Sequence, residues 1–138
     1  MKLLLLLLLP FSAIGQFTAG AILSHDTKGG YLQRVWTGEN NWFGSLGVEV
    51  LTFKEQKPFI PLTLGAGYSF GVPFIAAGAG AGINTARQYG AMAEIGAGVR
   101  ISAARLQLVY RGAAMPVGEQ DGSGTYGQGW FFRVGFVF

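Results

Sequence analysis

The chain has 138 residues, enough for a single domain, and a formal net charge of +3 at neutral pH. Half of its residues are hydrophobic and only 12% are charged, whereas soluble domains usually carry about 25% charged residues. The absence of cysteine excludes disulfides and thiolate metal sites. No basic stripe is present, so nucleic acid is not expected as a partner.

The N-terminus has the pattern of a secretory signal peptide. Lys2 supplies a basic start, Leu3 to Leu9 form an apolar run, and Ala13-Ile14-Gly15 gives a small-x-small cleavage site. The run is too short to cross a bilayer as a helix, which needs about 20 residues. We therefore expect a signal peptide over residues 1–15 and a mature domain over residues 16–138.

The mature chain alternates between apolar and small or polar residues with a period of two, which is typical of β-strands. Clusters of turn-forming residues divide it, and the length of the mature chain fits eight membrane-spanning strands but not ten. The fold class predicted is all-β, an eight-stranded antiparallel up-and-down transmembrane barrel. The expected strands cover residues 17–25, 31–37, 42–53, 58–70, 74–83, 89–101, 105–115 and 126–138.

Alternation alone fits a soluble barrel as well as a membrane barrel, and the glycines separate the two. Gly78, Gly80, Gly96 and Gly98 share the polar phase with Glu94. Glycine weakens a strand, but inside a narrow barrel it makes room for long polar side chains. This phase is therefore expected to face inward and the apolar phase to face lipid. The inward face of residues 31–37 stays undecided. Aromatic residues near strand ends are expected to form the girdles at the membrane surfaces: Trp42, Phe53, Phe59, Phe70, Phe74, Tyr89, Tyr110, Tyr126 and Phe138.

A set of charged and polar residues falls in the inward phase. Buried charges are costly unless paired, so these residues should form a hydrogen-bonded network. A plug that fills the lumen is favoured over an ion or proton path, because eight strands enclose little more than side chains. Arginines outnumber glutamates in the set, so one or more should lie near a rim and contact water or lipid phosphate. The predicted network contains Glu49, Glu94, Arg100, Arg105, Gln107, Arg111 and Arg133.

The last strand carries apolar residues at alternate positions and ends on an aromatic residue: Trp130, Phe132, Val134, Phe136 and Phe138. With the signal peptide and the eight strands, this resembles the small OmpA/OmpX-type outer-membrane barrels of Gram-negative bacteria. The resemblance implies that the barrel-assembly machinery reads this last strand, and that outer-membrane lipids surround the barrel. An even strand count places both termini in the periplasm and the loops around 26–30, 54–57, 84–88 and 117–125 outside. The oligomeric state is not given, and a monomer is expected.

Two alternatives to a non-catalytic structural or binding role remain. One is a lipid-modifying enzyme resembling lipid A acyl hydrolases, with His25, Ser123 and Glu119 as weak candidates near the outer rim. The consecutive residues Ser24-His25-Asp26 cannot act as a triad, because neighbouring strand residues point to opposite faces. The other alternative, a porin-like channel for small solutes, is disfavoured by a filled lumen. No cofactor or metal site is expected, since one histidine and no cysteine offer too few ligands.

Overall fold

The computed structural model describes residues 15–25, 27–53, 56–85, 87–114 and 129–138. Eight strands and one short 3₁₀ helix, η1, make up this part of the chain. Every strand has nine or more residues, which is the length that a tilted membrane strand needs. The strands are β1 (Gly15–Leu23), β2 (Thr27–Thr37), β3 (Trp42–Phe53), β4 (Gln56–Ser69), β5 (Pro73–Asn84), β6 (Tyr89–Ile101), β7 (Ala104–Ala114) and β8 (Gly129–Val137), with η1 at Glu39–Asn41.

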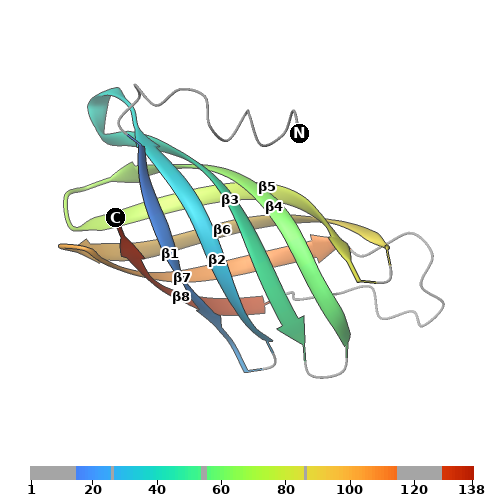
Figure 1. Ribbon diagram of the computed structural model, residues 1–138. Helices are drawn as coiled ribbons and strands as arrows, with labels where there is room; N and C mark the ends of the chain where they lie inside the picture. The colour runs from blue at the N-terminus through green and yellow to red at the C-terminus, as the bar shows by residue number, and fades with distance from the viewer. Residues whose placement is uncertain (1–14, 26, 54–55, 86, 115–128) are drawn as a thin grey trace.

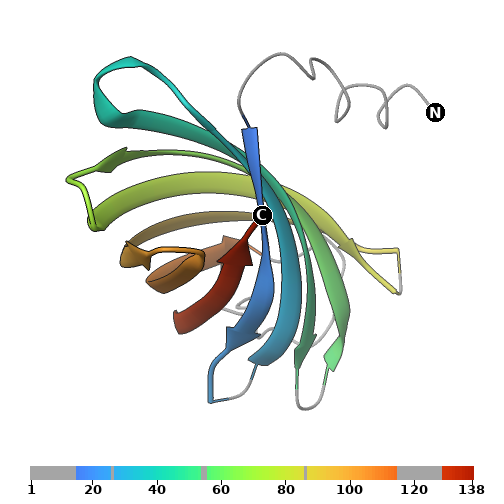
Figure 2. The same cartoon turned by 60° about the vertical axis from the view of Figure 1, so that its left-hand side comes forward.

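The strands form one closed antiparallel barrel in which each strand pairs with the next (Figures 1 and 2). β8 closes the barrel against β1, with a register that runs from Thr18 opposite Val137 to Leu23 opposite Phe132. Closure leaves no sheet edge with unpaired backbone groups. The structure thus confirms the predicted all-β, eight-stranded antiparallel barrel.

The two ends of the barrel differ in the strand termini and connections that lie there. β1 begins and β8 ends at the same end (Figure 1), here called the terminal end, which also holds the connections around η1, Phe70–Val72 and 102–103. The strands β1, β3, β5 and β7 end at the opposite end, here called the loop end. Within the described residues, no helix has the length and apolar character needed to cross a membrane.

The second strand is longer than the sequence predicted. It begins at Thr27, not at residue 31, because Gly29 and Gly30 pair with Leu51 and Val50 of β3. The two glycines resemble a turn signal, yet a side chain at Gly29 would collide with the backbone carbonyl of Val50. The turn predicted over residues 26–30 is correspondingly shorter.

The structure also shows which face of β2 points inward. Tyr31 is buried, whereas Leu32 and Trp36 are exposed on the outer surface. Arg34 shares the outer face with them and lies over the ring of Phe17, 5.8 Å from its centroid.

The outer surface of the barrel is apolar and the interior is mixed. Leu64 and Phe136 are 61% and 66% exposed, whereas the inward Arg133 of the last strand is 5% exposed. Glycines give the interior its room. A Cβ atom at Gly135 would collide with the Tyr31 hydroxyl, and one at Gly98 would lie 2.6 Å from the Phe74 ring. Apolar side chains fill the loop end of the interior: Ile22, Tyr31, Leu51, Phe59, Met92 and Phe131.

Two of the aromatic residues predicted for the girdles lie inside instead. Phe59 and Phe74 are buried, because they share the strand phase of the inward glycines Gly65 and Gly78. Trp42, Phe70, Tyr89, Tyr110 and Phe138 are exposed. Tyr126 and the side chain of Phe53 lie outside what the structure describes.

Candidate functional site

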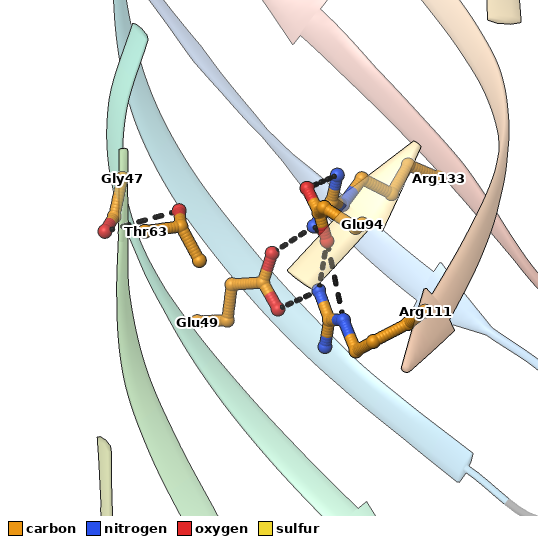
Figure 3. A network of polar contacts seen from close by, with 6 residues as sticks. All are labelled: Gly47, Glu49, Thr63, Glu94, Arg111 and Arg133. Atoms are coloured by element: carbon orange, nitrogen blue, oxygen red, sulfur yellow. Dashed lines mark hydrogen bonds and ion pairs between the residues drawn. The ribbon is translucent and has the colours of Figure 1, made fainter. Parts of the chain in front are cut away.

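Four charged side chains meet in the middle of the barrel. Glu49 comes from β3, Glu94 from β6, Arg111 from β7 and Arg133 from β8, and all four point toward one another across the lumen (Figure 3). Arg111 Nη2 donates to Glu49 Oε2 and to Glu94 Oε2, both at 2.7 Å, and Arg111 Nε donates to Glu94 Oε2 at 3.1 Å. Arg133 donates to Glu94 from Nη1 at 2.8 Å and from Nη2 at 3.0 Å, and its Nη2 also bonds Glu49 Oε1.

This central network is balanced in charge and shielded from water. Two carboxylates meet two guanidinium groups, and each arginine forms an ion pair with both glutamates. Arg111 also lies over the Phe131 ring, 5.1 Å from its centroid, and Arg133 over the Tyr31 ring at 5.8 Å. Cation–π contacts of this kind favour a guanidinium away from water. The network joins four strands into one cross-linked layer.

Only part of this arrangement follows from neighbouring strands. Glu94 and Arg111 lie opposite each other in the β6–β7 ladder. The bonds from Glu49 to Arg111 and Arg133 cross the lumen and join residues 62 and 84 positions apart. The sequence phase predicted that these residues face inward, but it gave no indication of which of them meet.

The cavities beside the network are small. The one bordered by Gln33, Ser45, Thr63, Glu94 and Gln107 has about 10 Å³, which is about the least space that one water molecule needs. Thr63 Oγ1 donates to the carbonyl of Gly47 at 3.4 Å, beside the ion pairs (Figure 3). At this level, side chains fill the barrel.

Three other residues of the predicted network lie nearer the terminal end. Gln107 and Arg105 are buried, whereas Arg100 is exposed at the mouth of the barrel. Arg100 and Arg105 are directly opposite each other in the β6–β7 ladder. Neither arginine forms an ion pair with a described residue. Arg105 instead lies over the rings of Phe74 and Phe43, 4.4 Å and 5.7 Å from their centroids.

These two arginines border a cavity of about 150 Å³ at the terminal end. The cavity is partly open, and its apolar wall is made by Phe43, Phe74, Val35 and Val137. The sequence did not predict this cavity. The sequence does indicate that Phe74 faces inward, because it shares the strand phase of Gly78, Gly80 and Gly82.

The residues considered for catalysis are not brought together in the described part of the chain. His25 is exposed in the connection between β1 and β2. Ser123 and Glu119 lie outside the described residues, so their distance from His25 is not defined. Among the described residues, no group of three or more histidine, aspartate or glutamate side chains could hold a metal ion.

The residues considered as an assembly signal all lie on the outer surface. Trp130, Phe132, Val134, Phe136 and Phe138 are exposed. Phe138 follows the last strand but still pairs with β1: its amide donates to the carbonyl of Phe17 at 2.8 Å, and its carbonyl accepts from the amide of Phe17 at 3.0 Å. The rings of Phe17 and Phe138 are stacked with centroids 6.3 Å apart.

Comparisons with protein-family models, with curated proteins and with solved structures find no match. Three features of this barrel bear on its function: its apolar outer surface, its central ion-pair network and the cationic cavity at its terminal end.

Proposed function

We propose that this chain is an integral outer-membrane β-barrel protein with a structural or binding role in the cell envelope and no catalytic activity. The observation that carries the proposal is the reversal of the usual soluble pattern. Apolar side chains such as Leu64, Ile95 and Phe136 cover the outside, while four paired charges occupy the centre. In water, an apolar surface of this extent would favour aggregation, whereas in a bilayer it is the surface that lipid requires.

The closed hydrogen-bond ladder of the barrel also supports a location in a lipid bilayer. A bilayer offers no water to unpaired backbone groups, and a closed barrel has no edge strand. In the proposed orientation the terminal end faces the periplasm and the loop end faces outside. Residues 1–15 then act as the signal peptide; residues 1–14 lie outside the described part, and Gly15 is the first residue of β1. Outer-membrane lipids surround a monomeric barrel, and the barrel-assembly machinery inserts it by its last strand.

The central network supports a structural role over a channel. Its four side chains bond one another across the lumen, so a solute could pass only if ion pairs opened. Separating buried ion pairs without replacement partners is costly. The network therefore closes the barrel to solutes and fixes β3, β6, β7 and β8 relative to one another.

The proposal is tested by expressing the full chain in a Gram-negative host and separating its membranes. We expect the protein in the outer-membrane fraction, with a mature N-terminus at Gln16. In detergent, the folded barrel should migrate differently on a gel before and after boiling. A soluble protein, or a band whose position does not change on boiling, would contradict the proposal.

A further inference from the structure

The cavity at the terminal end combines features that the proposed structural role does not use. Arg100 and Arg105 are the charged residues that border it, and no described carboxylate lines it. The two arginines lie opposite each other on the adjacent strands β6 and β7. Like charges held this close favour an anion between or beside them.

Arg105 has aromatic neighbours but forms no ion pair with a described carboxylate. It is 7% exposed, and its Nε has no hydrogen-bond partner in the described part of the chain. A buried cation without a counter-charge is costly, so its retention requires a compensating interaction. The Phe74 and Phe43 rings compensate part of this cost through cation–π contacts. The central carboxylates do not add to it, because they are already paired with Arg111 and Arg133.

A second polar group of the same cavity is also buried without a hydrogen-bond partner in the described part of the chain. Thr18 on β1 lines the cavity, is 1% exposed, and its hydroxyl has no partner among the described residues. Buried hydroxyls are normally hydrogen-bonded. Two buried polar side chains, from β1 and β7, thus border one space. Thr18 Oγ1 and Arg105 Nε are themselves shielded from solvent, so a ligand in this space would bond the Nη groups of Arg105.

The Nε group of Arg105 is shielded from solvent, so its two Nη groups are the donors considered for a ligand. The Cζ atom of Arg105 lies over the Phe74 and Phe43 rings, and the N–H groups of a guanidinium lie in one plane. A planar fork of this kind suits the two oxygens of a carboxylate or phosphate. The surrounding rings, with Val35 and Val137, provide an apolar wall for the rest of a ligand.

We propose that this cavity binds a small organic anion, with a carboxylate or phosphate head held by Arg100 and Arg105 and an apolar group against Phe43 and Phe74. The cavity volume of about 150 Å³ matches that of a cavity known to hold one benzene ring. The site requires only the folded barrel. That the cavity opens toward the periplasm rests on the proposed membrane orientation. The binding test below uses the folded protein in detergent, so its result does not depend on where the protein lies in the cell.

The test uses the full mature chain, folded in a non-ionic detergent and checked for its heat-dependent gel shift. Phenylphosphate, benzoate and the neutral benzyl alcohol are titrated by isothermal calorimetry. We expect the two anions to bind and benzyl alcohol to bind at least about tenfold more weakly, since a charged hydrogen bond is lost. Equal binding of the neutral compound would overturn the proposal.

Variants assign the binding to the two arginines. Arg100→Gln changes an exposed residue, so the barrel should fold, and we expect phenylphosphate to bind about tenfold more weakly. Arg105→Lys keeps the charge but removes the planar fork, and it should weaken binding while preserving the gel shift. Arg87→Gln is the matched control, because Arg87 is exposed at the loop end, and it should bind like the parent. If Arg100→Gln also binds like the parent, the site is not where we place it.

The anion could come from a free metabolite or from a lipid headgroup, and a further titration distinguishes these sources. A short-chain phosphatidic acid and a phosphatidylcholine of the same chain length are compared in mixed micelles. Tighter binding of phosphatidic acid than of phenylphosphate would indicate a lipid source. Binding of phenylphosphate alone would indicate a soluble ligand. In either case Arg100→Gln should reduce the affinity, and an affinity that does not depend on this residue would contradict the proposal.

Discussion

Replacing Glu49 by glutamine removes one of the two carboxylates at the centre of the barrel while keeping the shape of the side chain. Glu49 takes part in two ion pairs, one with Arg111 at 2.7 Å and one with Arg133. Glu94 keeps both arginines paired after the substitution. The cluster therefore changes from neutral to a net charge of +1 without leaving either arginine isolated.

Breaking a buried ion pair by removing one partner costs roughly 3–5 kcal/mol. Because each arginine retains one carboxylate, we expect Glu49→Gln to lower the free energy of unfolding by about 3 kcal/mol, the lower end of that range. The measurement is a urea titration of the barrel in non-ionic detergent, followed by tryptophan fluorescence. Glu39→Gln is the matched control, since Glu39 is exposed in η1, and its effect should stay within about 0.5 kcal/mol.

A double variant tests whether charge balance is the cause. Arg133→Met alone leaves two carboxylates with one arginine, whereas Glu49→Gln with Arg133→Met leaves the neutral pair of Glu94 and Arg111. The cost of the double variant should be smaller than the sum of the two single costs by about 0.5–3 kcal/mol. Strictly additive costs, or a Glu49→Gln variant as stable as Glu39→Gln, would refute this reasoning.

Four further experiments test the packing, the outer surface, the lumen and the hydrolase alternative. Gly135→Ala places a methyl group against the Tyr31 hydroxyl and should lower the free energy of unfolding by about 1–3 kcal/mol. Adding Tyr31→Phe should restore part of this loss in the urea titration. Gly112→Ala is the control, because its Cβ atom would have no neighbour within 4 Å and should not destabilise the barrel by a clash. Leu64→Arg on the outer face should lower the free energy of unfolding by about 2–4 kcal/mol when the barrel is folded in lipid vesicles. Val72→Arg, in the connection before β5, should change it little. Equal losses for the two variants would argue against a lipid-facing belt. Liposomes containing the parent protein should show no swelling in sugar solutions, and measurable sugar uptake would contradict a filled lumen. His25→Ala should leave lipid A acylation unchanged in mass spectra, since a loss of deacylation would revive the hydrolase alternative.

The local features of this barrel could be predicted from the sequence because strand alternation depends only on neighbouring residues. The inward phase of Glu94, Arg111 and Arg133 follows from their positions in the pattern. The start of β2 could not be predicted in the same way. Gly29 and Gly30 have the composition of a turn, and only the close approach of the Val50 carbonyl shows why glycine is needed within the strand.

Contacts across the lumen could not be predicted, because they depend on how far each strand is shifted along its neighbour. That shift brings Tyr31 over Gly135 and Glu49 to Arg133, although each pair is far apart in the chain. The cavity at the terminal end is a similar case. It requires Thr18 of β1, Phe43 of β3 and Arg105 of β7 to meet, and no single stretch of sequence contains all three.

The central ion pairs also have a consequence for the order of folding. Arg133 belongs to β8, the last strand, and it bonds carboxylates on β3 and β6. Until β8 docks between β7 and β1, Glu49 and Glu94 have only Arg111 as a counter-charge, and the half-formed barrel holds an excess negative charge. The longest loop closure is therefore the one that balances the charges of the central network. A barrel whose last strand is missing or misplaced keeps an unbalanced charge in its central network. This charge destabilises a seven-stranded barrel relative to the complete one.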